Sequence, residues 1–295
     1  MRILLATDGS RSATAALQTA IRLLNPVDRR ADLLCVAPRR PSRSHAAGDA
    51  YERRIRDEMT RILECAKLAL PRDAGVTDLL SEIGSPTGVI LKRAKEYDLT
   101  VIGAKGRGAT NDVGLGPVAS RVVEHIPGPV LIARDLRGDG PIRVLIAVDG
   151  STASLDAIQT LTSFVDLNSA EVCLMHVAET PWIELGVGED WVTYSEEDKE
   201  NSEVGTLEKE LVLEGEGVIE QARDLFRAQR LSITTCLVEG NPANEILSEV
   251  ERSQCDLVVV GASGARDLKH RILGSVSARV AWDANCSVLI AKGSE

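Results

Sequence analysis

The sequence predicts an α/β protein with two five-stranded parallel sheets in tandem, each in the flavodoxin-like strand order. Two observations predict this class. The chain repeats itself once, and each copy alternates short apolar, β-branched runs with segments of helical spacing. The matching segments are 2–10 with 143–151, 34–37 with 175–178, 84–86 with 240–242, 98–103 with 256–261, and 129–134 with 287–292. We therefore expect one domain at 1–138 and another at 141–295, joined by a short flexible linker at 137–141.

Each copy is expected to hold five strands with helices between them. The apolar runs lack polar alternation, which is typical of parallel strands covered on both faces. Helical stripes follow the first and second strands of the first copy. Their residues are Ala13, Leu17, Ala20, Ile21 and Leu24, then Ile55, Met59, Ile62, Leu63, Ala66 and Leu70. Ligands on such sheets sit at the carboxyl ends of the strands near the switch in strand order. In the first copy, Asp8 ends the first strand and Gly103 ends the fourth, so we expect these two residues to share a crevice. Asp149 and Gly261 hold the same positions in the second copy, and we expect the same of them.

The second copy carries a candidate phosphate-binding loop after its fourth strand. Gly261 and Gly264 are followed, after nine intervening residues, by Gly274, Ser275 and Ser277. Glycines let the backbone approach an anion closely, and a helix N-terminus with hydroxyls donates hydrogen bonds to phosphate oxygens. This spacing therefore predicts an anion site at 274–277.

The first copy keeps the glycines of this loop but loses its hydroxyls. Gly103, Gly106 and Gly116 remain, whereas Pro117 and Ala119 stand where the second copy has serines. Proline has neither a hydroxyl nor an N–H, so two donors vanish at one position. Two interpretations of Lys105 and Arg107 stay open: they compensate with charge, or they are ordinary residues of an exposed loop.

These motifs, in this order and present twice, make the chain resemble a tandem universal stress protein. The resemblance implies a Rossmann-like fold, ATP as cofactor, possible Mg²⁺ with it, and two domains that pair through their fifth strands as a pseudo-dimer. It implies that Asp149 and the backbone of Val177 contact adenosine, and that Gly261 and Gly264 line the ribose and phosphates. The residues implied to hold the phosphates are Gly274, Ser275, Val276 and Ser277. The weaker first-copy counterparts are Asp8, Val36, Gly103, Gly106 and Gly116.

Several side chains have a second interpretation. An acid before Gly-Ser can cap the following helix, which competes with ligand contact for Asp8 and Asp149. The basic loop residues Arg266, Lys269 and Arg271, with Asp267 and His270 among them, either neutralise phosphates or form an ordinary charged loop. We expect His176 to pack near the crevice. No spacing among His45, His125, His176 and the cysteines predicts a metal site, and no catalytic group is assigned.

Charge is divided unevenly along the chain. The net charge is −10, with 22 basic and 17 acidic residues in 1–139 and 12 against 27 in 140–295. This balance and the absence of a long apolar run disfavour nucleic-acid and membrane partners. The six scattered cysteines are typical of buried thiols in a reducing cytoplasm. An acidic segment, 179–216, with Trp182, Trp191 and Tyr194, is either a solvated loop or a mobile gate or docking arm that meets the arginine-rich 38–61.

The sequence therefore predicts a cytoplasmic, ATP-binding sensor or regulator of the stress response that binds chiefly through its second copy. A homo-oligomer or a protein partner is compatible with this prediction. Two alternatives stay open: a slow ATP hydrolase or adenylyl-transfer enzyme, and an interaction module without nucleotide.

Overall fold

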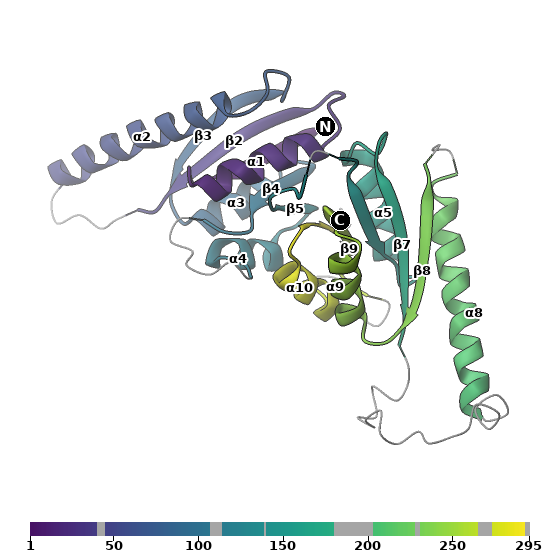
Figure 1. The fold of residues 1–295 in the computed structure, drawn as a ribbon. Coiled ribbons are helices and arrows are strands. Elements are labelled where there is room, and N and C mark those ends of the chain that lie inside the picture. Colours follow the sequence, from purple (N-terminus) through teal and green to yellow (C-terminus); the bar gives the residue numbers. More distant parts are fainter. Residues whose placement is uncertain are drawn as a thin grey trace.

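The computed structural model describes residues 1–39, 45–106, 114–138, 140–179, 203–227, 231–264 and 273–292. The strands are β1 (Arg2–Thr7), β2 (Arg30–Ala37), β3 (Val76–Ile83), β4 (Leu99–Gly103), β5 (Val130–Ala133), β6 (Arg143–Ala147), β7 (Glu171–Ala178), β8 (Ile233–Glu239), β9 (Leu257–Gly261) and β10 (Ser287–Ala291). The helices are α1 (Arg11–Leu23), α2 (His45–Leu68), α3 (Pro86–Ala94), α4 (Pro117–His125), α5 (Thr152–Phe164), α8 (Glu203–Asp224), α9 (Pro242–Arg252) and α10 (Ser275–Asp283). The described strands join in one ten-stranded sheet (Figure 1).

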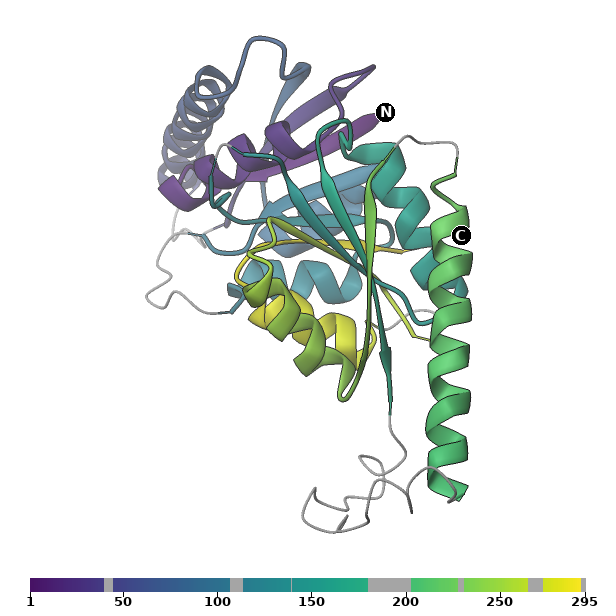
Figure 2. The ribbon, with the colours of Figure 1, turned by 45° about the vertical axis from the view of Figure 1, so that its right-hand side comes forward.

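Helices cover both faces of this sheet, as the unbroken apolar strands predict (Figures 1 and 2). One core contains Leu17 of α1, Leu63 of α2, Ala157 of α5 and Ala222 of α8. The other core contains side chains from the remaining helices: Ile90 of α3, Val122 of α4, Ile246 of α9 and Val280 of α10. Each core therefore runs through both halves of the chain, and the predicted α/β class with mostly parallel strands is confirmed.

The strand order corrects one part of the prediction. Each half has the order 3-2-1-4-5, as in β3-β2-β1-β4-β5, rather than the flavodoxin-like 2-1-3-4-5. The residue types give a physical reason, because β3 carries polar side chains such as Thr77, Asp78 and Glu82 that an edge strand tolerates, whereas β4 is almost entirely apolar. The less buried strand occupies the edge. The first and fourth strands still flank the switch point, so the expected neighbours β1–β4 and β6–β9 are paired.

The two halves meet through their fifth strands, as predicted. β5 and β10 pair antiparallel, with Leu289 opposite Leu131 at the centre. This pairing joins the two five-stranded sheets into a single continuous one. Both edges that would otherwise be exposed in the middle of the molecule are covered.

Two basic side chains, one from each half, donate hydrogen bonds across this junction. The Arg134 guanidinium donates to the carbonyls of Ala281 (2.8 Å) and Cys286 (3.0 Å), at the end of α10. The Lys292 ammonium donates to the carbonyls of Val123 (3.1 Å) and Glu124 (3.2 Å), in the last turn of α4. Each half thus places a positive charge at a helix C-terminus of the other half, where the helix dipole favours a cation.

The arginine-rich and acidic helices lie at opposite ends of the sheet. α2 packs on β2 and β3 at one edge, and α8 packs on β7 and β8 at the other (Figure 1). The described residues therefore give no support to the predicted contact between 38–61 and 179–216 within one chain. Residues 180–202, including Trp182, Trp191 and Tyr194, lie outside the described residues. Residues 203–216 are the start of α8 and not a separate arm, because Val204, Leu207 and Leu211 have helical spacing amid the acids.

Gly215 lets α8 approach the end of β7 closely. A Cβ built on Gly215 would lie 2.8 Å from His176 Cδ2 and 2.7 Å from Leu237 Cδ1. The buried positions 215, 219 and 222 of α8, and 226 just after it, match at a constant offset Met59, Leu63 and Ala66 of α2, and Leu70 just after it. The equivalent positions of the first half hold the larger Met59 in α2 and the small Cys35 in β2, whereas the second half has Gly215 in α8 and the large His176 in β7.

We expect Gly215→Ala to destabilise the protein although alanine favours helices. The overpacking should cost about 1–3 kcal/mol, against a gain of at most about 1 kcal/mol in helix propensity. Gly217→Ala is the matched control, because a Cβ at Gly217 meets nothing within 4 Å. It should stabilise by up to about 1 kcal/mol. Urea unfolding measures both, and equal effects of the two substitutions would refute the close packing of α8.

Candidate nucleotide-binding site

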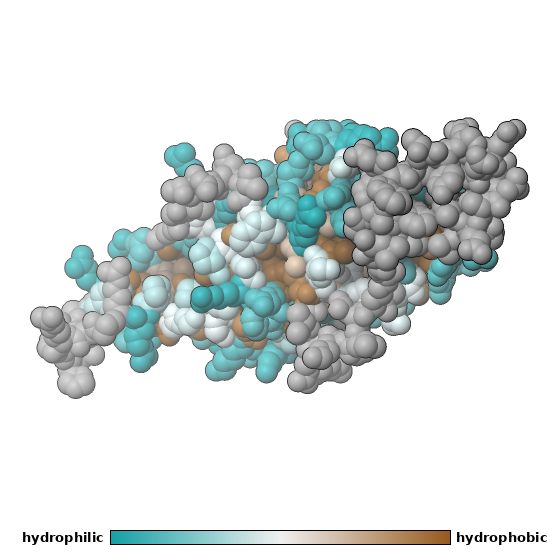
Figure 3. Space-filling model, turned by 90° about the horizontal axis from the view of Figure 1, so that it is seen from below, coloured by the Kyte–Doolittle hydropathy of each residue, from teal (hydrophilic) through white to brown (hydrophobic). Residues whose placement is uncertain are grey.

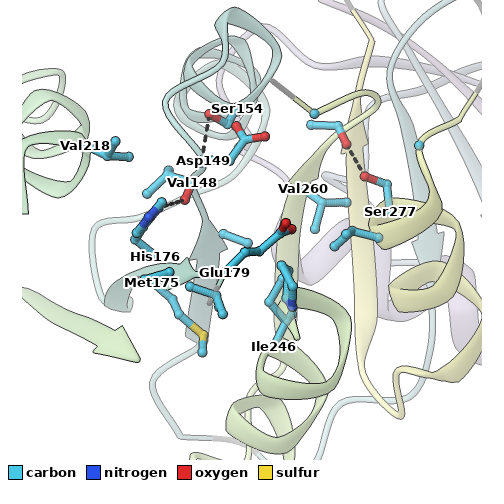
Figure 4. Close-up of a pocket in the computed structure, with 18 of the residues that line it drawn as sticks. Val148, Asp149, Ser154, Met175, His176, Glu179, Val218, Ile246, Val260 and Ser277 are labelled. Atoms are coloured by element: carbon cyan, nitrogen blue, oxygen red, sulfur yellow. Dashed lines mark hydrogen bonds between the residues drawn. The ribbon is translucent and has the colours of Figure 1, made fainter. Parts of the chain in front are cut away.

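A cavity of about 500 Å³ lies where β6, β7 and β9 end (Figure 4). It is bounded by α8, by α9 and by the N-terminus of α10. The eight residues predicted for the second-half site all line it: Asp149, Val177, Gly261, Gly264, Gly274, Ser275, Val276 and Ser277. In the space-filling view from below, apolar side chains reach the surface along the middle of the molecule between polar flanks (Figure 3).

Asp149 turns the chain from β6 into α5. Its Oδ1 accepts hydrogen bonds from the Ser151 N–H (3.0 Å) and the Ser151 hydroxyl (2.5 Å), and Gly150 between them has a φ of +76°. Ser151 in turn caps α5 by accepting from the Ser154 N–H at 3.1 Å. The helix cap is therefore the serine and not the aspartate that the sequence analysis considered. A serine hydroxyl one residue before the helix reaches the free N–H groups, and the aspartate orients that serine.

The other carboxylate oxygen of Asp149 faces the loop after β9. A Cβ built on Gly264 would lie 3.1 Å from Asp149 Oδ2, so this oxygen lies over the second glycine of the motif. Gly261, the first glycine, has a different reason to be small. A Cβ there would lie 2.8 Å from the carbonyl carbon and oxygen of Ala153 in α5. Gly261 therefore allows the helix to pack against the strand end, in addition to lining the cavity.

The N-terminus of α10 presents a set of donors to the cavity. Gly274 is the N-cap and has no side-chain cap, so the N–H groups of Ser275, Val276 and Ser277 lie in the turn that has no intrahelical acceptors. The Ser275 side chain is exposed and lines the cavity. The buried Ser277 hydroxyl instead donates to the Gly261 carbonyl and joins α10 to β9. Its proton is thus engaged within the protein rather than aimed at a ligand.

The backbone of Val177 faces the same cavity. The ladder between β6 and β7 ends at Ala147 and Met175, and the Val148 N–H donates to the Met175 carbonyl at 2.9 Å. Backbone groups two residues apart on a strand point to the same side. The N–H and carbonyl of Val177 therefore point to the side where β6 has ended. His176 Nδ1 lies 2.8 Å from the Val148 carbonyl, and since a carbonyl only accepts, this ring nitrogen carries the proton. His176 packs beside the crevice, as expected.

The first half has the same backbone arrangement with fewer donors. A Cβ on Gly106 would lie 2.5 Å from Asp8 Oδ2, and one on Gly116 would lie 3.8 Å from the Gly106 nitrogen. The structure thus brings Asp8, Gly106 and Gly116 together. Gly103 ends the neighbouring strand β4, and Val36 at the end of β2 packs partly buried against the core. Ser10, not Asp8, caps α1.

The start of α4 lacks the donors that α10 offers. Pro117 is its first residue and has no N–H, and Ala119 is buried where the second half has Ser277. Arg107 lies outside the described residues, as do Arg266, Asp267, Lys269, His270 and Arg271.

Several residues line the cavity although no role in the site was predicted for them. They include Glu179, just after β7; Glu214 and Val218 of α8; and Ile246 of α9. Glu179 comes two residues after Val177, which was predicted to contact the ligand, so its position in the sequence could have indicated that it lines the site. Glu214 was hidden because α8 was interpreted as part of an acidic loop.

The cysteines are free thiols rather than disulfides, and burial makes Cys255 and Cys286 less acidic. All six cysteines are free, and Cys35, Cys255 and Cys286 are buried while Cys65 is exposed. Burial raises the pKa of the Cys255 thiol to about 12 and that of Cys286 to about 11. In the described part of the chain, no group of three metal-ligating side chains comes together and no helix is long and apolar enough to cross a membrane.

Comparison with known proteins agrees with this fold. The model of the universal stress protein family matches residues 1–134 and again residues 142–292. The chain therefore belongs to the universal stress protein family and contains two of its domains.

Individual relatives cover one domain or both. A universal stress protein of Mycobacterium tuberculosis is 27% identical over 252 residues, which are 83% of this chain and 77% of the relative. One from Methanocaldococcus jannaschii is 31% identical over 151 residues, 51% of this chain and 81% of the relative. The crystal structure of a universal stress protein from Archaeoglobus fulgidus superposes with a TM-score of 0.66 at 18% identity. It covers 99% of this chain and 98% of that one, so the whole two-domain fold is shared.

Proposed function

We propose that the second half binds an adenine nucleotide, with ATP as the ligand, and that binding makes the protein a sensor or regulator of the stress response. The observation that carries the proposal is the N-terminus of α10 in the wall of a cavity large enough for a nucleotide. Three N–H groups and the Ser275 hydroxyl offer four donors to phosphate oxygens, and the helix dipole adds to them.

The remaining walls suit the rest of the nucleotide. The Val177 N–H and carbonyl form a donor–acceptor pair, which complements the ring nitrogen and amino group of adenine. Oδ2 of Asp149 lies beside Gly264 and would accept a hydrogen bond from a ribose hydroxyl. Met175, Val218 and Ile246 supply apolar walls for the base. Mg²⁺ accompanying the phosphates and a cytoplasmic location belong to the same proposal.

The first half is proposed to bind the same ligand weakly. With Pro117 and Ala119 at the start of α4, two N–H groups remain against four donors at α10. A hydrogen bond to a charged group contributes about 1.5–3 kcal/mol, so the loss of two donors should leave one dominant site. The two domains would then differ in role, one binding and one completing the sheet.

Substitutions at the start of α10 test the placement of the phosphates. Ser275→Ala should weaken ATP about tenfold, because one hydrogen bond to a charged acceptor is lost. Gly274→Val should weaken ATP more, because its side chain occupies the space at the buried N-cap. Both should leave adenosine binding within about twofold, and Gly116→Val in the first half is the matched control. Equal losses for ATP and adenosine in calorimetric titrations would mean that the phosphates lie elsewhere. Multiple-turnover release of ADP or AMP would instead favour an enzyme.

A further inference from the structure

The helix whose N-terminus lines the cavity, α10, is held at its two ends by different halves of the chain. Near its start, the Ser277 hydroxyl donates to the Gly261 carbonyl, within the second half. In its last turn, the Ala281 carbonyl accepts from the Arg134 guanidinium of the first half. The helix therefore extends from the proposed phosphate site to the junction of the halves, where it lies on the same face of the sheet as α4 (Figures 1 and 2).

Arg134 is itself fixed in place at the end of β5. Its guanidinium also donates to the Cys286 carbonyl just before β10 at 3.0 Å. Its backbone N–H donates to the buried Ser287 hydroxyl at 3.1 Å, and that hydroxyl donates back to the Arg134 carbonyl at 3.2 Å. Because backbone and side chain are both bonded to the second half, the guanidinium has a defined position under α10. A cation in this position also stabilises the helix through its dipole.

Trp282 forms a second contact between the end of α10 and the first half. A Cβ built on Gly114, which has a φ of +88°, would lie 2.9 Å from Trp282 Nε1 and 3.0 Å from its Cε2. The indole therefore lies against the backbone of Gly114, two residues before Gly116, the N-cap of α4. Glu124 occupies the equivalent position of α4, so of these two helices only α10 carries an aromatic ring there.

The repeat places a less rigid hold on α4, the helix with fewer phosphate donors. Lys292 corresponds to Arg134 and donates to two carbonyls in the last turn of α4. Pro129, which has no hydroxyl, stands where the second half has Ser287, so that anchor of the backbone is not repeated. An arginine presents a planar fork of donors, whereas a lysine is a point charge on a flexible stem. The firmer hold is thus on the helix that offers more donors to a phosphate.

The length of α10 makes its two ends depend on each other. It has nine residues, which span about 13 Å. An isolated helix shorter than about 12 residues is marginal in water, so tertiary contacts keep such a helix formed and oriented. Contacts at the last turn therefore help to fix the direction of the N–H groups in the first turn.

We propose that Arg134, assisted by Trp282, is a positioning residue for the phosphate end of the second-half site. It acts from the first half by holding α10, so that the N–H groups at the start of this helix point at the phosphates. The affinity of the second half for ATP then depends on its pairing with the first half. By linkage, bound ATP strengthens that pairing. This inference rests on the proposed function and adds a role for the first half in it.

Calorimetric titrations of the two-domain chain with ATP and with adenosine test this role. Arg134→Met removes the guanidinium and should weaken ATP binding about fivefold. It should leave adenosine within about twofold, because adenosine has no phosphate to contact α10. Arg134→Lys restores a cation and should recover most of the lost affinity. Lys292→Met removes the corresponding cation from α4, and as the matched control it should leave ATP binding at the dominant site within about twofold.

Trp282→Ala tests the same hold at an exposed side chain, and so gives an answer even if Arg134→Met does not fold. It should weaken ATP about threefold and leave adenosine unchanged, because the end of α10 loses its contact with Gly114. Glu124→Ala, at the equivalent exposed position of α4, is its control and should change neither affinity.

The outcomes separate this inference from the proposed function. If folded Arg134→Met and Trp282→Ala both bind ATP as the wild-type protein does, the positioning role is wrong and the proposed function stands. Equal losses for ATP and adenosine, or an equal loss of ATP binding in Lys292→Met, would show that these contacts support the fold in general, and would also overturn the positioning role. If the wild-type protein binds neither compound, the proposed function fails and the inference fails with it.

Discussion

Leu289→Asp should unfold or nearly unfold the whole chain. Leu289 is 1% exposed and lies opposite Leu131, which is 0% exposed, at the centre of the antiparallel pair that joins the halves. The substitution removes a core side chain and buries a carboxylate with no partner. The expected loss in the free energy of unfolding is more than about 4 kcal/mol, a large part of a typical domain's stability.

Two variants separate this effect from unspecific damage. Leu289→Met keeps the apolar character and should cost less than about 1.5 kcal/mol. Leu213→Asp introduces the same charge at a side chain of α8 that is 66% exposed, and should have little effect. Urea unfolding followed by circular dichroism compares all three. A Leu289→Asp protein as stable as Leu213→Asp would refute the pairing of β5 with β10.

Gly261→Ala should have the second largest effect, on stability and on ligand binding together. The added Cβ would lie 2.8 Å from the Ala153 carbonyl and 3.0 Å from the Ser154 nitrogen, both backbone atoms of α5. Backbone cannot rotate away as a side-chain end can, so α5 must move off β9. We expect a loss of about 3 kcal/mol. Nucleotide affinity should fall too, because Asp149 lies at the start of the same turn and Ser277 bonds to the Gly261 carbonyl.

The repeat supplies the matched control for this glycine. Gly103 occupies the same place in the first half, but there a Cβ would lie 3.3 Å from the Lys105 carbonyl oxygen and 3.5 Å from Ala16 Cβ. Gly103→Ala should therefore cost about 1 kcal/mol or less. Similar losses of stability for Gly261→Ala and Gly103→Ala in thermal unfolding would show that the packing of α5 is not the reason for a glycine at position 261.

The sequence was sufficient for features that the repeat and the apolar runs determine. The strand segments, the helices between them and the convergence of Asp149 with Gly261 and Gly264 at one cavity follow from patterns that local physics controls. The pairing of β5 with β10 followed from family resemblance and from the need to cover an open edge.

Other features depend on neighbours that sequence patterns do not reveal. The flavodoxin-like order was wrong, because β3 lies at the edge, where its polar side chains Thr77 and Asp78 are exposed. The Ser277 hydroxyl looked like a phosphate donor, but it lies close to the Gly261 carbonyl only after β9 and α10 pack. The start of α8 was missed because its many acids resemble a solvated loop, although Val204, Leu207 and Leu211 have helical spacing in the sequence.

A calorimetric titration of the two-domain chain with ATP and Mg²⁺ tests the central claim most directly. The account predicts one dominant site per chain, which Gly274→Val removes and Gly116→Val leaves intact. Two equal sites, or a single site that is lost in Gly116→Val and kept in Gly274→Val, would contradict it.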